Sequence, residues 1–335
     1  MYRRTAISSV SNYSVTAMFI LLLAAPPSAS SQDATRMELD FTARHTEPPT
    51  GNGHQLLAYG LDLQHVISNG ERDIATILFQ PYLVSLRENP RPPYYFDDGN
   101  DTSIQWRYTF INYTGFSNGL FNIRAGHMEV PFGAEGFEFD TGGTLRQLLT
   151  NTGIKVDWGV SVNGGNRYFE YEVARTKGSG MEWRSSGDPH LLSGRIGTST
   201  RYNHVVGYSV LNGDMWTPKG TVARARQAID YRGFFGAWRI IAELSAGDDN
   251  GYDRDSRLVE LARTAGNGNF QAYAQLRDQT SALPSGQDQD MTSLTWGINW
   301  RLKRKFWLEF QAIQPLNVSV GNDEATFQLQ LRARI

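Results

Sequence analysis

The sequence predicts an all-β fold: a closed 16-stranded antiparallel transmembrane β-barrel with short turns at one end and long loops at the other. Three observations predict it. Sixteen segments alternate between apolar and polar residues, and the connections between them alternate between short and long. The only long apolar run lies at the N-terminus, where an export signal would lie.

The composition excludes several classes of protein. The 335 residues carry a net charge of −2, which does not suit a nucleic-acid-binding protein. The absence of cysteine excludes disulfide scaffolds, cysteine nucleophiles and thiolate metal sites. A mean hydropathy of −0.42 excludes a membrane protein built of many apolar helices.

The N-terminus predicts a secretory signal peptide. Arg3 and Arg4 precede the apolar run Val15–Ala25, and prolines and small residues follow it. The alternative is a membrane anchor, but about 11 apolar residues rise only about 16 Å as a helix, too short for a bilayer core of about 30 Å. We therefore expect a signal peptide over residues 1–30 and a barrel over residues 31–335.

The alternation is clearest at the C-terminus. One face there is apolar and the other polar: Phe327, Leu329, Leu331, Ala333 and Ile335 against Gln328, Gln330, Arg332 and Arg334. Successive side chains of a strand point to opposite faces, so each such segment predicts a strand with one apolar face. The segments lie near 36–45, 54–67, 73–86, 103–113, 119–128, 152–163, 167–177, 191–200, 203–212, 223–233, 236–247, 256–264, 269–279, 292–302, 305–314 and 325–335.

The connection lengths predict the orientation of the barrel. The short connections include 68–72, 163–166, 233–236 and 302–305; the long ones are 87–102, 129–151, 178–190, 213–222, 248–255, 280–291 and 315–324. Outer-membrane barrels have short periplasmic turns and longer extracellular loops. An even number of strands then puts both chain ends on the periplasmic side of the outer membrane.

A soluble β-sandwich or β-solenoid is the alternative, because those folds also alternate. The positions of the aromatic residues favour the barrel, since amphipathic rings prefer the membrane–water interface. The rings expected on the outer face are those of Trp106, Tyr108, Trp158, Trp238, Trp296 and Trp300.

A barrel of 16 strands leaves an aqueous lumen, and the parity of the strands predicts which residues line it. By parity the wall carries thirteen basic and nine acidic side chains. The basic residues expected to line the pore near a constriction are Arg107, Arg124, Arg224, Arg226, Arg232 and Arg239. Close to the last four, the only acidic side chains that we expect as counter-charges are Asp230 and Glu243.

The connection 129–151 has an unusual composition. It carries four acidic residues against Arg146, and it is rich in apolar residues. Because a solvated loop needs few apolar groups, we expect it to fold into the lumen and narrow the pore, with its acids opposite Arg107 and Arg124. The alternative is a loop that only caps the rim. The acidic residues are Glu129, Glu135, Glu138 and Asp140.

A short motif resembles a known porin family. Residues 126–133 read GHMEVPFG directly after the strand segment 121–125, and 155–159 and 194–213 also resemble that family's middle strands. The family is that of the phosphate-selective porins O and P. The resemblance implies a 16-stranded, trimeric outer-membrane channel in which lumen arginines and lysines guide anions. Unlike the family, this chain has an acidic inward loop and no dense lysine cluster, which does not favour selectivity for phosphate.

Sequence motifs for catalysis or cofactors are absent. The chain has no HExxH, GxSxG, GxxxxGK or CxxCH pattern, so we expect neither an enzyme nor a cofactor or metal site. His127 and Glu129 could face one side of a strand end, but two side chains at a rim are the simpler interpretation. The acidic segment 248–255 could bind calcium or bridge lipopolysaccharide; a solvated surface loop is the simpler interpretation.

Two classes of function remain. The first is an outer-membrane porin for passive diffusion of small polar solutes or ions, with a weak preference for anions. The second is a structural sleeve that holds a partner, such as an electron-transfer cytochrome, across the membrane. The expected partners are outer-membrane lipid, lipopolysaccharide, small anions or polar solutes and two further copies of the chain, and not nucleic acid.

Overall fold

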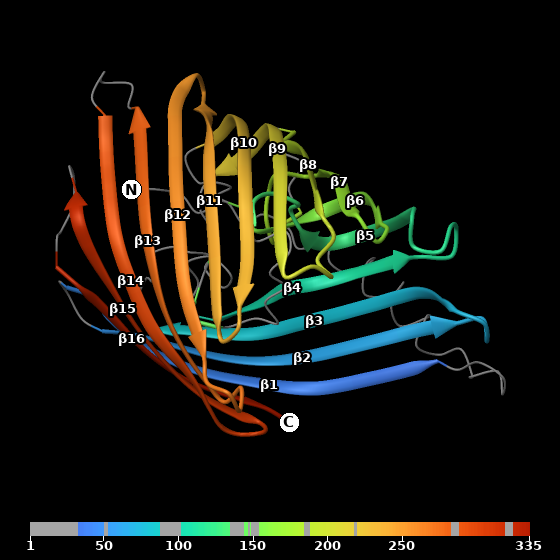
Figure 1. Ribbon diagram of the computed structural model, residues 1–335, viewed down its shortest axis with the longest axis horizontal. Helices are drawn as coiled ribbons and strands as arrows, with labels where there is room; N and C mark the ends of the chain where they lie inside the picture. Colours follow the sequence, from blue (N-terminus) through green and yellow to red (C-terminus); the bar gives the residue numbers. More distant parts are fainter. Residues whose placement is uncertain are drawn as a thin grey trace, which may run out of the picture.

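A computed structural model describes residues 33–49, 53–87, 102–134, 144–146, 148, 154–183, 188–217, 220–282, 288–318 and 324–335. They form one closed barrel of 16 antiparallel strands, which confirms the predicted fold class (Figure 1). The strands are β1 (Ala34–Glu47), β2 (His54–Ser68), β3 (Asp73–Arg87), β4 (Thr102–Tyr113), β5 (Asn122–Glu129), β6 (Val156–Gly165), β7 (Phe169–Thr176), β8 (His190–Thr198), β9 (His204–Thr217), β10 (Gly220–Phe235), β11 (Trp238–Asp249), β12 (Tyr252–Thr264), β13 (Phe270–Ala282), β14 (Asp288–Lys303), β15 (Phe306–Val318) and β16 (Thr326–Arg334). The predicted signal peptide lies outside the described residues.

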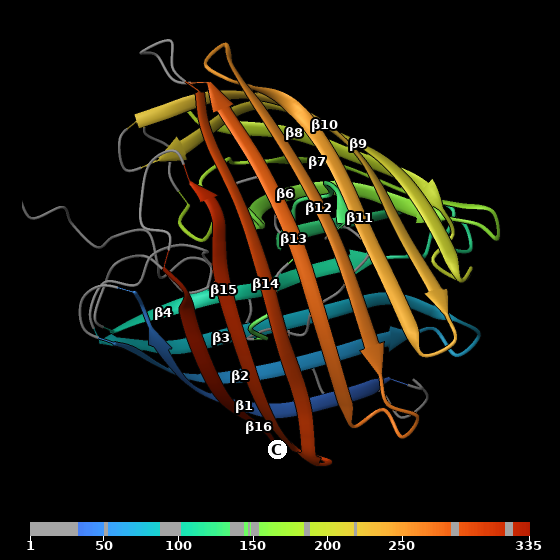
Figure 2. The same cartoon turned by 60° about the vertical axis from the view of Figure 1, so that its left-hand side comes forward.

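The first and last strands close the barrel. Each strand pairs with its neighbours in sequence, and β1 pairs with β16. At this seam Asp40 lies opposite Arg334, and the backbone amide of Leu39 donates to the carbonyl of Ile335 at 2.8 Å. In Figures 1 and 2 the blue β1 and the red β16 lie side by side. Closure leaves no unpaired strand edge, which a membrane-spanning sheet requires.

The two faces of the wall differ as the alternation predicts. In β9 the exposed residues Val206, Tyr208 and Val210 alternate with the buried residues Val205, Ser209 and Leu211. The exposed set is apolar and faces outward, as a lipid-facing surface must. Within the described residues, no helix is long and apolar enough to cross a membrane.

The expected long connections at 213–222 and 248–255 are wrong. β9 and β10 extend through the first, and β11 and β12 extend through the second. Only Asn250 and Gly251 join β11 to β12, with φ angles of 52° and 80°. Positive φ at both central residues gives a tight turn whose twist matches that of the strands. The strands on this side of the barrel are therefore longer than the alternation alone suggested.

The expectation that Tyr108 faces lipid is also wrong. The pairing of β3 with β4 shifts between Phe79 and Pro81, where proline has no N–H to donate to the ladder. The shift buries the neighbours Arg107 and Tyr108 together, each only 1% exposed. Tyr108 packs in a cluster with Phe110, Met128, Val156 and Ala174. A bulge of this kind reverses the parity of the residues that follow it.

Candidate functional site

The connection between β5 and β6 turns into the barrel directly after β5. The backbone amide of Val130 donates to the carbonyl of Lys155 at 2.9 Å, which extends the pairing of β5 with β6 by one step. Val130 and Phe132 are then buried against Leu191 of β8 and Leu211 of β9. These partners lie on the inner face of the wall, so the start of the connection packs against the lumen side.

Two hydrogen bonds hold the next residues to the wall. The amide of Gly133 donates to Ser209 Oγ at 2.9 Å, and the amide of Ala134 donates to Glu243 Oε2 at 2.7 Å. Gly133 has a φ of +64°, and a Cβ atom there would lie 2.2 Å from Glu243 Oε2. Only glycine allows the backbone to approach this carboxylate so closely.

The later part of the connection reaches strands farther round the barrel. The amide of Leu145 donates to Glu309 Oε2 of β15 at 2.8 Å. Arg146 binds Glu260 of β12 through Nε at 2.7 Å and Nη2 at 2.9 Å. Leu148 packs with apolar residues of β11 and β12. The described part of the connection thus contacts the inner wall from β8 to β12 and at β15.

The expected acids of the connection are only partly described. Glu129 is half-buried at the end of β5, whereas Glu135, Glu138 and Asp140 lie outside the described residues. Their placement opposite Arg107 and Arg124 stays a prediction. In the contacts that are described, the charges are reversed: the carboxylates belong to the wall, and the connection supplies the donors.

Arg107 and Arg124 each lie against an aromatic ring of β4. Arg107 lies with its guanidinium carbon 4.9 Å from the centre of the Tyr108 ring. Arg124 donates through Nη1 to Glu172 Oε1 at 3.1 Å, and its guanidinium lies 4.8 Å from the ring of Phe110. Both side chains therefore lie against the same aromatic cluster, since Tyr108 and Phe110 pack together.

The arginines of β10 gather around one carboxylate. Arg224 Nε and Arg226 Nη2 each donate to Asp249 Oδ1 at 2.7 Å, and Arg254 Nε lies 3.4 Å from Asp249 Oδ2. Arg232 instead donates to the carbonyl of Thr200 at 3.2 Å. Asp249 is thus shared by three guanidinium groups.

The counter-charges identified from sequence were wrong. Asp230 pairs with Arg195 of β8 at 2.9 Å, and Glu243 accepts from the connection. Arg239 of β11 donates to Glu260 Oε1 at 3.2 Å. The reason is geometric: Arg195 reaches Asp230 across an intervening strand, and the inward connection reaches Glu243, whereas the sequence argument considered only residues of β10 and β11.

Sequence reasoning missed Asp249, Arg254 and Glu260. Asp249 and Arg254 lie within the segment 248–255, which was expected to be a loop. Glu260 lies in the segment 256–264, where the alternation is too weak to assign side chains to the lumen. The signal that could have found them is the Asn250-Gly251 pair, since Asn-Gly between alternating segments predicts a two-residue hairpin.

The described residues contain no cluster of side chains that could ligate a metal ion. No group of three or more histidine, aspartate and glutamate side chains is placed to hold a metal ion within the described ranges. His127 is fully buried, its Nδ1 lies 2.7 Å from the carbonyl oxygen of Arg107, and its ring packs on Trp158. The acidic segment around Asp249 forms a hairpin that pairs with arginines.

Solved structures of outer-membrane channels share this fold. The in-vitro folded OmpT of Vibrio cholerae, in its trimer form, matches with a TM-score of 0.66 and 9% identity over 90% of this chain and 99% of its own. Salmonella typhi OmpF in complex with daunomycin matches with a TM-score of 0.64 and 8% identity over 90% of this chain and 97% of its own. The anion-selective porin from Comamonas acidovorans matches with a TM-score of 0.60 and 12% identity over 91% of this chain and all of its own, 100%.

The chain has the fold of an outer-membrane porin. Neither a family model nor a curated protein matches it in sequence. The resemblance to the phosphate-selective porins O and P therefore holds at the level of the general porin fold. These neighbours are named as porins and outer-membrane proteins.

Proposed function

We propose that the chain forms a water-filled channel for passive diffusion of small hydrophilic solutes and ions, with a weak preference for anions. The observation that carries this proposal is the connection between β5 and β6. Its contacts through Ala134, Leu145 and Arg146 reach the inner wall on β11, β15 and β12. A segment bound across the inside of a wide barrel narrows the path without closing it, which is how a diffusion channel sets a size limit.

The preference for anions rests on an arginine that faces a neutral acceptor. Arg301 binds the amide oxygen of Asn269 through Nε at 3.0 Å and Nη2 at 2.9 Å. The other inner-wall arginines named above mostly face carboxylates, so their fields partly cancel. One structural neighbour is named as an anion-selective porin, which is consistent with this proposal.

Planar-bilayer recording tests the channel and its selectivity. We expect stable single-channel conductance, and a reversal potential across a tenfold KCl gradient that indicates weak anion preference. Deleting residues 134–148 is expected to raise the conductance because it removes the constriction. An unchanged conductance would contradict the constriction, and a strongly cation-selective reversal potential would contradict the anion preference.

A sleeve for a partner protein is the alternative, and the lumen contacts do not favour it. A partner threaded through the barrel needs the space that the connection between β5 and β6 occupies. We also propose a homotrimer, supported by the trimer form named for the Vibrio cholerae neighbour. Light scattering of the detergent-solubilised protein measures the number of chains, and a monomer would contradict the trimer.

A further inference from the structure

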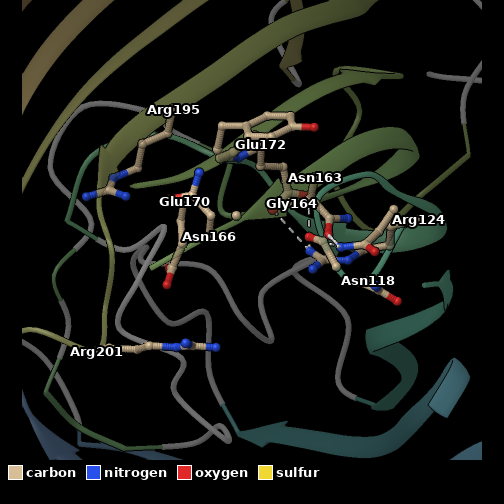
Figure 3. A pocket seen from close by; sticks show the side chains of 14 residues that line it. Asn118, Arg124, Asn163, Gly164, Asn166, Glu170, Glu172, Arg195 and Arg201 are labelled. Atoms are coloured by element: carbon tan, nitrogen blue, oxygen red, sulfur yellow. Dashed lines mark hydrogen bonds and ion pairs between the residues drawn. The ribbon is translucent and has the colours of Figure 1, made fainter. Parts of the chain in front are cut away.

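A polar cavity lies inside the barrel near its short turns. It has a volume of about 430 Å³. It is lined by residues of β5 to β8, by the turns β4–β5, β6–β7 and β8–β9, and by Pro131 of the inward connection (Figure 3). The cavity is thus bounded by the wall on one side and by the connection on the other. A solute that passes the connection meets this cavity on its way along the lumen.

Three of the five charged residues that line this cavity, Arg124, Glu172 and Arg195, are paired with an opposite charge. Arg124 binds Glu172 at 3.1 Å, and Arg195 binds Asp230 at 2.9 Å. These pairs leave two further charges, those of Glu170 and Arg201, to be accounted for.

Glu170 and Arg201 have no charged partner among the described residues. Glu170 Oε1 accepts from Ser199 Oγ at 2.9 Å and from the amide of Thr200 at 3.0 Å, and these donors are neutral. Arg201 is exposed, and no ion pair of its guanidinium is present in the described part of the chain. Figure 3 shows both side chains directed into the same cavity. The cavity therefore offers one uncompensated negative and one uncompensated positive group.

An amide cluster forms a neutral part of the cavity wall. Asn122 Nδ2 donates to Asn163 Oδ1 at 3.1 Å, and Asn163 Nδ2 donates to Asn112 Oδ1 at 3.0 Å. Asn122 is only 7% exposed. Because these side chains bond to one another and carry no charge, Glu170 and Arg201 set the charge pattern of the cavity.

We propose that this cavity is a binding site for small zwitterionic solutes that carry a carboxylate and an ammonium group, such as a free amino acid. The carboxylate binds Arg201, while the ammonium group binds Glu170. A simple anion is repelled by Glu170 and a simple cation by Arg201, so neither gains both contacts. This inference rests on the proposed channel function and names a solute class for it.

Three matched probes test the charge pattern in the planar bilayer. L-Alanine carries both groups, lactate has a hydroxyl in place of the ammonium, and isopropylammonium lacks the carboxylate. We expect L-alanine to reduce the KCl current in a saturable way, with an affinity about tenfold higher than that of either singly charged probe. Equal effects of the three probes at equal concentrations would overturn the proposal.

Charge-neutralising variants locate the site. Arg201→Gln and Glu170→Gln are each expected to weaken the L-alanine effect about tenfold while the KCl conductance persists, since each removes one charge-assisted contact. Arg301→Gln, which changes a lumen arginine on β14, serves as the control and should leave the L-alanine effect intact. If one cavity variant fails to insert, the other still tests the site, because each contributes one of the two charges.

The outcomes separate this proposal from the channel function. A conducting channel whose current is unaffected by L-alanine refutes the site and leaves the channel function standing. An L-alanine effect that survives both cavity variants places the binding elsewhere and also refutes the site. A protein that inserts without conducting refutes the channel function itself.

Discussion

Replacing Arg146 with methionine tests whether the pore constriction depends on a single buried ion pair. Arg146 makes two hydrogen bonds to Glu260, of 2.7 and 2.9 Å, and the Glu260 side chain is 0% exposed. Breaking a buried pair costs about 3–5 kcal/mol. Glu260 keeps Arg239 at 3.2 Å and Gln275 at 2.7 Å, so we expect the lower end of that range. A loss of about 3 kcal/mol shifts the ratio of released to bound connection roughly a hundredfold.

The expected result of Arg146→Met has two parts. The later half of the connection is released more often, so single-channel conductance and current noise both rise. The lumen also loses one positive charge. The interaction of that charge with an ion about 4 Å away is worth about 1 kcal/mol in water, which changes the local concentration of the ion roughly fivefold. The reversal potential across a KCl gradient therefore moves towards cations.

A matched control separates these effects from a general disturbance of the barrel. Arg257 lies on β12, the strand that carries Glu260. Its side chain is exposed, and its Nη1 atom lies 3.6 Å from Asp278 Oδ2. Arg257→Met should leave conductance, noise and selectivity unchanged. If Arg146→Met inserts normally and gives the parent's conductance and noise, the reasoning that this pair holds the constriction is refuted.

Three further predictions concern charge, backbone and pH. Asp249→Asn removes the carboxylate shared by three arginines, so the anion-to-cation permeability ratio should rise several-fold, whereas Asp255→Asn should leave it unchanged. Gly126→Ala places a Cβ atom 2.2 Å from a backbone oxygen, at a φ of +134°. We expect this strain to cost about 1–3 kcal/mol of stability, so the barrel should unfold at a lower temperature in a gel-shift assay of heated samples. Gly194→Ala is the control and should not change that temperature, because the nearest atoms to its Cβ lie at 3.5 Å. Burial lowers the pKa of Lys155, just before β6, to about 7 from 10.5. The unfolded chain then holds this proton to higher pH than the folded one, so the free energy of unfolding should rise between about pH 7 and 10, and Lys155→Met should reduce that slope in denaturant titrations.

The fold could be predicted from sequence because each strand carries its own signal. A period of two repeats in every segment, and apolar faces must meet lipid, so the strand order of an up-and-down barrel follows with little freedom. The contacts across the lumen carry no such local signal. Leu145 and Glu309 are far apart in sequence, and only the closure and tilt of the barrel bring them together.

The glycine of the PFG motif shows how a pattern can be noticed before its cause is known. In the sequence, Gly133 supported a family resemblance and nothing more. In the structure its φ of +64° favours glycine, and a Cβ atom there would displace the Glu243 carboxylate from its place beside the backbone. The carboxylate belongs to a strand more than a hundred residues away, so no local argument could have supplied this reason.

Parity failed at Tyr108 because it assumes an unbroken ladder. One register shift opposite Pro81 buries Tyr108 and Arg107 together on the same strand. A proline within a predicted strand is the warning that could have been used, since it removes a ladder hydrogen bond and favours a bulge.

In the proposed channel, the electric field that acts on an ion depends on which charged side chains of the wall are paired, rather than on the total charge of the wall. A guanidinium and a carboxylate about 3 Å apart act at longer range as a dipole, whose field falls faster than that of a single charge and is further reduced beyond a Debye length of about 8 Å. The pairs Arg195–Asp230 and Arg146–Glu260 are of this kind. The field of Arg301, which faces an amide oxygen, is not cancelled in this way. A count of charged residues along the wall therefore overstates the field, and the proposed weak preference for anions rests on arginines whose acceptor is neutral.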